Sequence, residues 1–250
     1  MIIKKLKVIL VPSKKKRLYV ENMSYYFYSY FMDFFGDDIS NKLHENTLKP
    51  ISIFTYKNMN NDEYVVNINI IADEHFCNEI VNKILSIESY DINALNESFK
   101  VKEKIMYPSI TEDEYTKKYL YSINDRNLRQ INILTTTTFK QGDEYALFPE
   151  IHLILNSAVN KWNNFSKKYQ IIDKQVIEEI NNSCKIINYN LKTSTYIIKG
   201  SRIDGFKGTI RIAINSNNTI KGLIFMILDF LNYSGLGIKT ALGMGGVKVE

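Results

Sequence analysis

The sequence predicts an α+β protein made of two tandem ferredoxin-like domains. Segments with strand and helix periodicity follow the order β-α-β-β-α-β, and the same order roughly recurs in the second half. A length of 250 residues also leaves room for two domains of ordinary size. We expect the division within residues 108–127, a polar stretch without clear periodicity, which gives domains over 1–122 and 123–250.

The first half supplies each element of the pattern in turn. Residues 2–11 alternate as a strand, and residues 21–36 form an aromatic-rich helix that Gly36 ends. The polar residues 37–48 are expected to be a loop. Apolar spacing then predicts strands over 51–56, 63–72 and 98–107, with a helix over 73–88 before the last of them.

The second half repeats this order with one additional short helix. A Thr-rich strand is followed by a helix whose apolar stripe includes Trp162. The expected strands cover 128–139, 184–199, 205–215 and 246–249, and the expected helices cover 150–168, 173–181 and 219–232.

Composition excludes several classes of protein. Hydrophobic residues make up 45% and charged residues 24%, which excludes a disordered chain and a multi-span membrane protein. The two cysteines, Cys77 and Cys184, are far apart and form no CxxC pair, so no metal site and no other cofactor is expected. Two free thiols and the lack of a long apolar run favour a reduced, cytoplasmic protein that does not enter a membrane.

Positive charge is concentrated in the second half. Residues 1–122 contain 16 basic and 17 acidic residues, whereas residues 123–250 contain 16 and 10. A cluster of this kind suits a phosphate backbone, with a solvated surface as the alternative. The side chains of this cluster that could contact phosphates are Lys199, Arg202, Lys207 and Arg211.

Five of the 11 glycines fall between residues 235 and 246. The segment follows a helix and leads into a strand, which excludes a dinucleotide fingerprint or a P-loop. Glycines here permit either an anion-binding backbone nest or a tight packing loop. The residues of the segment that could bind an anion are Gly235, Gly237, Lys239, Thr240, Gly243 and Gly245.

Three stretches together resemble the CRISPR-associated endoribonucleases that process precursor CRISPR RNA, members of the RAMP superfamily. They are NKLHENTLKPISIFTY, ILTTTTFKQGDEYALFPEIHLILNSAVNKWNNF and GLGIKTALGMGGVKV. The resemblance implies two ferredoxin-like domains and metal-independent cleavage within the repeats. In that reaction the 2′-OH attacks the adjacent phosphorus and leaves a 2′,3′-cyclic phosphate and a 5′-OH.

The resemblance also implies a catalytic histidine. His44 matches the Leu-His pair of the first stretch, and a histidine can donate or accept a proton near neutral pH. The candidate helpers are Lys49 and a tyrosine of the aromatic-rich helix, Tyr28 or Tyr30. Tyr30 is the predicted one, although packing is at least as good an interpretation of it. An ungapped comparison instead places Met32 at the family's tyrosine and Ser52 at its lysine.

Two other functions are compatible with these features. One is a non-catalytic RNA-binding scaffold of the same superfamily, which would not need His44. The other is a nucleotide-binding ferredoxin-like regulator that uses the glycine segment for a small anion. For the endoribonuclease, the expected partner is precursor CRISPR repeat RNA, and the further partners considered are other subunits of a CRISPR interference complex and a second copy of the chain.

Overall fold

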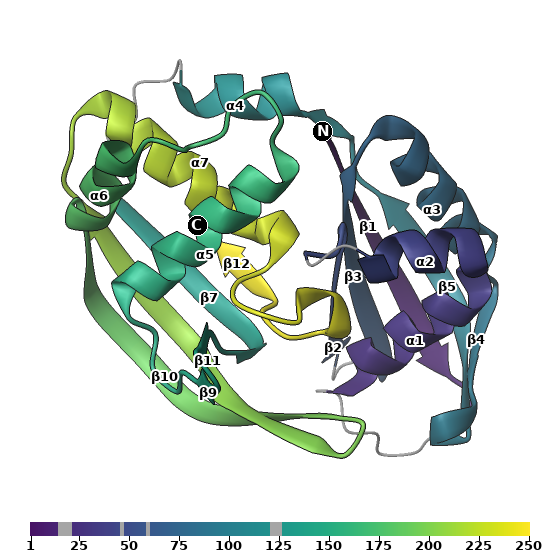
Figure 1. The fold of residues 1–250 in the computed structure, drawn as a ribbon. Coiled ribbons are helices and arrows are strands. Elements are labelled where there is room, and N and C mark those ends of the chain that lie inside the picture. Colours follow the sequence, from purple (N-terminus) through teal and green to yellow (C-terminus); the bar gives the residue numbers. More distant parts are fainter. Residues whose placement is uncertain (15–21, 46–47, 59–60, 121–126) are drawn as a thin grey trace.

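The computed structural model describes residues 1–14, 22–45, 48–58, 61–120 and 127–250. These residues form two antiparallel sheets that lie side by side, each with helices on one face (Figure 1).

The first sheet has the strand order of a ferredoxin-like fold. Its strands are β1 (Ile2–Pro12), β2 (Ile51–Asn58), β3 (Glu63–Ala72), β4 (Ser89–Ile92), β5 (Glu97–Met106) and β6 (Ile110–Thr111). They run in the order β2-β3-β1-β5-β4, with β6 paired to β1, and β1 is antiparallel to both β3 and β5. The helices packed on this sheet are α1 (Met23–Phe35), α2 (Asp37–Glu45) and α3 (Glu74–Ser86).

The second sheet repeats the same order, β10-β11-β7-β12. Its strands are β7 (Leu128–Thr137), β10 (Cys184–Ile198), β11 (Ser201–Ile214) and β12 (Val247–Val249). Its helices are α5 (Ile151–Phe165), α6 (Lys174–Asn182) and α7 (Asn218–Ser234). Smaller elements are the turn η2 (Asn93–Leu95), the hairpin of β8 (Lys140–Gln141) and β9 (Glu144–Tyr145), and the turn η3 (Thr240–Leu242). The prediction of two tandem ferredoxin-like β-α-β-β-α-β units is therefore confirmed.

Side-chain caps explain where three of these helices begin. Asp73 accepts a hydrogen bond from the backbone N–H of Phe76 at 3.0 Å, Asp173 caps α6 in the same way, and Asn217 caps α7. Each cap satisfies a donor that the first helical turn would leave unpaired. At the other end of α1, Gly36 has φ of 81°, which permits the abrupt stop that the sequence predicts.

Residues 37–45 form α2, so the prediction of a loop over 37–48 was wrong for these nine residues, and residues 46–47 lie outside the described part of the chain. Ile39 and Leu43 lie four residues apart on one face of α2, and both are fully buried. Asp37 and Asp38 occupy the first turn, where the helix dipole favours negative charge. A helix with so few apolar residues has the composition of a loop, which is why its sequence was misleading.

The polar stretch 108–127 contains a helix that was not predicted, α4 (Glu112–Leu120). Tyr115 and Tyr119 are buried in the second core, and the Tyr115 hydroxyl donates to the carbonyl of Met226 in α7 at 2.9 Å. Thus α4 precedes residue 122 and yet packs with the second sheet. The division at that residue stays a prediction, and residues 121–126 lie outside the described part of the chain.

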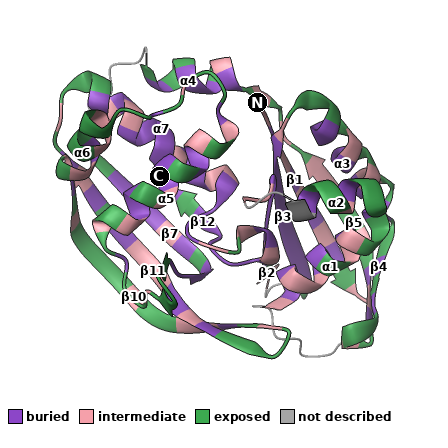
Figure 2. Cartoon of the chain, viewed as in Figure 1, coloured by how far each residue is buried: buried purple, intermediate pink, exposed green. Residues whose placement is uncertain are grey.

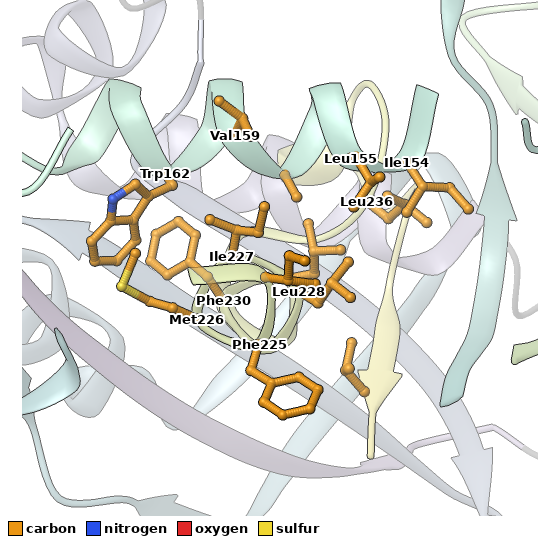
Figure 3. Packing of buried hydrophobic residues seen from close by; sticks show 14 of the residues in the cluster. Ile154, Leu155, Val159, Trp162, Phe225, Met226, Ile227, Leu228, Phe230 and Leu236 are labelled. Carbon is orange, nitrogen blue, oxygen red and sulfur yellow. The ribbon is translucent and has the colours of Figure 1, made fainter. Parts of the chain in front are cut away.

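The second core forms where α5 and α7 pack over their sheet (Figure 3). Trp162 is fully buried, and its ring meets that of Phe230 edge-on, with centroids 5.2 Å apart. Its indole N–H donates to the carbonyl of Tyr169 at 2.6 Å. The neighbouring Asn163 exchanges hydrogen bonds with the backbone of Ile171, so this Trp-Asn pair fixes the turn after α5.

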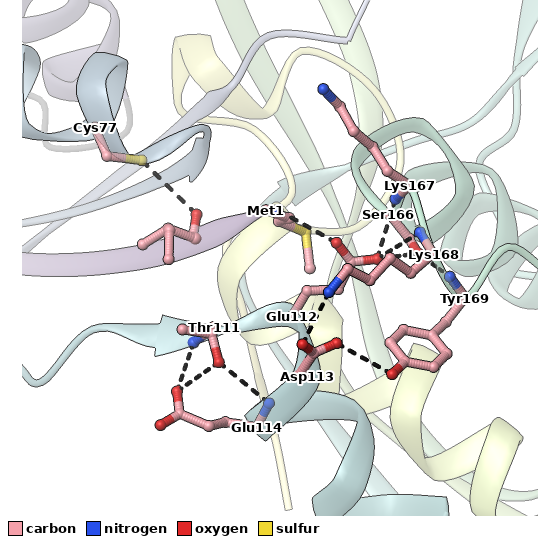
Figure 4. Close-up of polar contacts among 11 residues, drawn as sticks. Met1, Cys77, Thr111, Glu112, Asp113, Glu114, Ser166, Lys167, Lys168 and Tyr169 are labelled. Carbon is pink, nitrogen blue, oxygen red and sulfur yellow. Dashed lines mark hydrogen bonds and ion pairs between the residues drawn. The ribbon is translucent and has the colours of Figure 1, made fainter.

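Glu112 joins α4 to the same turn (Figure 4). Its carboxylate accepts hydrogen bonds from the Ser166 hydroxyl at 2.7 Å and from the backbone N–H groups of Lys167 and Lys168, each at 3.0 Å. It also pairs with the amino group of Met1 at 3.3 Å. Burial alone would raise the pKa of this carboxyl, but the Lys168 N–H and the other donors hold the pKa below its ordinary value.

Direct contacts connect the two sheets. The Ser52 hydroxyl on β2 donates to the carbonyl of Tyr233, near the end of α7, at 2.6 Å. Ile3 and Ile71 of the first sheet belong to the second core, whereas Ala241, from the segment after α7, belongs to the first. That segment lies between the two sheets in Figure 1. Its shape therefore depends on both halves of the chain.

The cysteines are structural in character. Cys77 and Cys184 are both buried free thiols, and burial raises their pKa values to about 11 and about 12. Within the described residues, no group of three or more His, Cys, Asp or Glu side chains is placed to hold a metal ion. In the same part of the chain, no helix is long and apolar enough to cross a membrane.

Candidate functional site

A groove of about 610 Å³ lies where α1, the segment before β2, the β10–β11 turn and the segment after α7 meet. We call it the α1 groove. Three lysines from distant parts of the chain, Lys49, Lys199 and Lys239, line it together with Leu48, Ile198, Gly237, Thr240, Ala241 and Leu242. Lysines gathered around a concave surface raise the local concentration of anions.

One face of α1 forms the opposite wall. Tyr25, Tyr28, Ser29 and Met32 line the α1 groove, and their spacing of three and four residues places them on a single helical stripe. Burial raises the pKa of the Tyr28 hydroxyl. Tyr28 and Met32 of this stripe were candidates from the sequence, whereas Tyr25 and Ser29 were not.

Tyr30 does not line the α1 groove. It is two residues from Tyr28, about 200° around the helix, and so it projects to another side. Its hydroxyl donates to the carbonyl of Ser89 at 3.2 Å, and its ring packs against Tyr90 and Phe34 with centroids 4.9 and 6.0 Å away. Burial raises its pKa, with a contribution from Asp91. These contacts correspond to the packing interpretation of Tyr30.

Lys49 reaches the α1 groove, and His44 lies on the helix that precedes it. Burial lowers the pKa of Lys49, because loss of water penalises its ammonium form. His44 lies at the next-to-last position of α2 rather than in the expected loop. Its side chain is outside the described part of the structure. Leu48, four residues further on, lines the groove.

Met32 and Ser52, the residues that the ungapped comparison places at the family's tyrosine and lysine, differ in their positions relative to the groove. Met32, at the position of the family's tyrosine, lines the α1 groove. Ser52, at the position of the family's lysine, is 6% exposed and bonded to the end of α7. Lys49 is therefore the lysine of this region that the structure brings to the groove.

The glycine segment 235–246 is held mainly through its own backbone. The N–H groups of Leu236, Gly237 and Ile238 donate to the Gly245 carbonyl, the Ser157 hydroxyl and the Thr138 carbonyl at 2.8, 3.1 and 3.2 Å. These donors are thereby used inside the protein. For this part of the segment the geometry is that of the packing loop, not of an anion nest.

Close backbone approach explains two of the glycines. A Cβ atom at Gly245 would lie 2.0 Å from the Leu236 carbonyl oxygen, and one at Gly237 would lie 2.3 Å from the Thr138 carbonyl oxygen. Both residues also have positive φ. Gly235 and Gly243 are likewise buried. The glycines therefore fix the path of the loop, and the side chains between them meet the groove.

The Thr-rich end of β7 receives this loop. Gly245 donates its N–H to the Thr136 carbonyl at 3.0 Å, and Gly246 donates to the Thr135 hydroxyl at 2.8 Å. Lys239 stands at the exposed point of the loop, in the left-handed region with φ of 55°. The conformation thus presents Lys239 and the neighbouring Thr240 to the α1 groove.

The β10–β11 hairpin reaches the groove at its turn. Lys199 and Gly200 both have positive φ, as a type I′ turn requires. Gly205 and Gly208 lie within β11 and not in the turn. A Cβ at either would meet a carbonyl oxygen, of Thr137 or Asn190, at 2.2 or 2.0 Å. Their function is close packing between strands.

A second concavity, of about 510 Å³, lies along this hairpin. We call it the hairpin basin. Lys192, Arg202 and Lys207 line it, with Asp204 accepting a hydrogen bond from Arg202 at 2.9 Å. Lys192 was not singled out from the sequence. Arg211 is exposed on β11 but does not line the basin.

The geometry suits an anionic polymer better than a small nucleotide. Cations from the α1 groove and the hairpin basin follow the hairpin from its turn into the strands. Figure 2 shows how much of β10 is exposed along this edge. A phosphate backbone can contact such a series of cations at successive positions.

Comparison with known proteins agrees with this architecture. Residues 131–247 match the family model described as CRISPR-associated endoribonuclease Cas6. A Cas6 endoribonuclease of Streptococcus thermophilus is 26% identical over 230 residues, which is 92% of each chain. One from Mycobacterium tuberculosis is 27% identical over 121 residues, 48% of this chain and 38% of that protein.

Solved structures share the whole fold. A Cas6 (TTHA0078) product complex superimposes with a TM-score of 0.81 at 14% identity and covers 100% of both chains. Cas6 (TTHB231) of Thermus thermophilus gives a TM-score of 0.73 at 18% identity, with 99% and 98% covered. The fold is thus that of the RAMP proteins, two ferredoxin-like units in tandem. Within that class, the chain is similar in sequence to the Cas6 family of CRISPR-associated endoribonucleases over most of its length.

Proposed function

We propose that this chain cleaves precursor CRISPR RNA within its repeats, without a metal ion, to give mature guide RNAs. The 2′-OH attacks the adjacent phosphorus, and the products carry a 2′,3′-cyclic phosphate and a 5′-OH. The observation that supports the site is the meeting of Lys49, Lys199 and Lys239 in one groove beside the segment that follows α2, the helix of His44.

The reaction needs a base for the 2′-OH, an acid for the 5′-oxygen and cations for the charge that develops on phosphorus. His44 takes one of the proton-transfer roles. Lys49 supports the developing charge, since a phosphate in the groove would favour the ammonium form that burial disfavours. Tyr30 has no role in this proposal, because its contacts hold it on another side of α1.

RNA is held by side chains rather than by the glycines. Lys239 and Thr240 contact phosphates at the groove, and Gly235, Gly237, Gly243 and Gly245 act by holding those two residues in place. Lys199, Arg202 and Lys207 extend the contact along the hairpin, and Arg211 adds a further cation on β11. Recognition of this kind reads the shape and backbone of RNA.

Incubation with repeat RNA in EDTA tests the chemistry. We expect cleavage at one position, with termini that phosphatase and kinase treatments identify as a cyclic phosphate and a 5′-OH. His44→Ala should lower the single-turnover rate by about 10²- to 10⁴-fold, the usual contribution of a general acid or base. Cleavage that requires a divalent ion, or that survives His44→Ala, contradicts the proposal.

Matched variants separate the catalytic site from general damage. His75→Ala and His152→Ala remove the other histidines, which lie at the start of α3 and α5, and should leave cleavage unchanged. Lys49→Ala should slow cleavage, whereas Lys174→Ala, on an exposed position of α6, should not. Tight binding of repeat RNA by the unaltered chain without any cleavage would instead identify the non-catalytic scaffold.

Repeat RNA is the partner that the relatives favour. Solved structures of Cas6 proteins include product and substrate-mimic complexes. A further structure, a partial Cas6-RT-Cas1–Cas2 complex, has a TM-score of 0.69 at 13% identity, and this chain covers 46% of it. Association with other CRISPR proteins and formation of a homodimer are tested by sedimentation of the chain alone and with repeat RNA.

A further inference from the structure

An exposed aromatic pair lies outside the proposed site. Phe148, between β9 and α5, and Tyr189, on β10, are 49% and 57% exposed. Their rings meet edge to face, with centroids 5.4 Å apart and an interplanar angle of 82°. Aromatic rings of this size usually bury most of their surface, so an ordered pair at the surface suggests a ligand.

The strand register shows why Tyr189 is not covered. Tyr189 lies opposite Ile210, which is fully buried, so both side chains project to the face of the sheet that bears helices. β10 is, however, the edge strand of this sheet. Phe148 reaches the same place from a different segment and supports the Tyr189 ring from one side. The other side of the pair remains accessible to solvent.

Positive charge adjoins the pair. The hairpin basin begins at Leu147, the residue before Phe148. Lys192, which lines the basin, follows Tyr189 by three residues, about 10 Å along the strand, and the alternation of side chains places it on the other face of the edge strand. Arg202 and Lys207 line the same basin. Aromatic rings beside a basic groove are the combination with which proteins hold unpaired nucleic acid, since every base has a face that can stack.

We propose that Phe148 and Tyr189 form a stacking subsite for an unpaired base of the bound RNA, while the basin cations contact its neighbouring phosphates. This rests on the proposed function insofar as RNA is the ligand. The subsite reads no particular base, because stacking is tolerant of sequence. It extends the RNA contact from the hairpin turn to the outer edge of the second sheet.

Affinity measurements with the full chain test the subsite. The probe is repeat RNA carrying 2′-O-methyl groups throughout, which binds but lacks the attacking hydroxyl. Loss of one stacked base typically weakens binding by about 1–3 kcal/mol, so we expect Tyr189→Ala and Phe148→Ala each to raise Kd by about 5- to 150-fold. Tyr189→Trp keeps a stacking surface and should stay within about threefold. Ile187→Ala, at another exposed apolar position of β10, is the matched control and should not change Kd.

Abasic substitutions then locate the base. One nucleotide of the probe is made abasic at a time, and at the stacked position Tyr189→Ala should cause no further loss. Folded variants that bind every probe as tightly as the unaltered chain would overturn the subsite. The subsite would also be overturned if Tyr189→Ala abolished self-association or the capture of another protein and left the Kd for RNA unchanged.

Two measurements keep this test independent of the proposed function and of folding. Failure of the unaltered chain to cleave repeat RNA removes the proposed activity, yet binding of the 2′-O-methyl probe still tests stacking. If an alanine variant does not fold, ultraviolet crosslinking of the unaltered chain to 5-bromouridine-containing repeat RNA gives the answer. An adduct at Tyr189 or Phe148 supports the subsite, and adducts confined to other residues overturn it.

Discussion

Lys161 makes the stability of this fold depend on pH in a direction that can be measured. It lies on α5, is 3% exposed, and its Nζ donates to the carbonyl of Ser234 at the end of α7, at 3.0 Å. Burial lowers its pKa to about 7, because the ammonium form loses its water. The unfolded chain keeps a lysine of ordinary pKa, near 10.4.

The sign follows from the two protonation states. Above pH 7 the unfolded chain holds a proton on this lysine that the folded chain has largely released, so raising the pH stabilises the fold. Between pH 7 and 8.5, a native pKa near 7 gives a gain of about 1.6 kcal/mol, at about 1.36 kcal/mol per pKa unit once the lysine is deprotonated. At higher pH the buried thiols of Cys77 and Cys184 oppose this gain. Burial raises their pKa values in the folded chain, so the unfolded chain releases these protons first and the fold loses stability as the pH rises.

Urea unfolding at pH 7.0 and 8.5 provides the measurement. The unaltered chain should gain about 1.6 kcal/mol in unfolding free energy beyond the change found for Lys161→Met, which removes the titrating group and keeps the length of the side chain. Lys174→Met, on an exposed position of α6, is the matched control and should keep the full pH dependence. Equal pH dependence in the unaltered chain and Lys161→Met would refute the argument.

Three further predictions concern stability and the site. Gly245→Ala should lower the unfolding free energy in urea by at least about 2 kcal/mol, because the added Cβ would lie 2.0 Å from a carbonyl oxygen. Gly142→Ala, also at positive φ but in open space, should lower it by about 1 kcal/mol. Equal losses for the two variants would refute the argument from close backbone approach. Tyr30→Phe should keep repeat cleavage within about twofold, and a tenfold loss would place its hydroxyl in the reaction. Arg129→Met should cost about 3–5 kcal/mol because it leaves Asp229 without its ion-pair partner; a thermal shift that corresponds to less than 1 kcal/mol would contradict this.

Element order was predictable because periodicity survives in long apolar segments. The longer strands of both sheets and the helix α5 were found close to their observed bounds for this reason, whereas the short strands β4 and β6 were not predicted. α2 was missed because Ile39 and Leu43 are its main apolar residues and the other positions are polar. Short polar helices of this kind are stabilised by tertiary packing, which local composition does not reveal.

The candidate site was predictable in part. Lys49, Lys199 and Lys239 were identified by charge and resemblance, and the structure brings them together. Chemical type allowed Tyr28 or Tyr30, and Tyr30 was the prediction. The direction of a helical side chain follows from its place around the axis, however, and Tyr28 is the one of the two that faces the groove. The packing of the glycine segment 235–246 could not be predicted, because its backbone N–H groups donate to Ser157 and Thr138, which lie far away in the sequence.

The shape of the glycine loop has a consequence for changing what this protein recognises. Its path is set by backbone contacts with the end of β7 and by glycines at close approach, none of which involves the Lys239 side chain. Residue 239 can therefore be exchanged while the loop keeps its course. Its φ of 55° limits the exchange to residues that tolerate a left-handed backbone, such as asparagine or glycine, and disfavours valine and isoleucine. Under the proposed contact of Lys239 with RNA, a small library at this position, rather than a redesign of the loop, is the economical route to altered RNA preference.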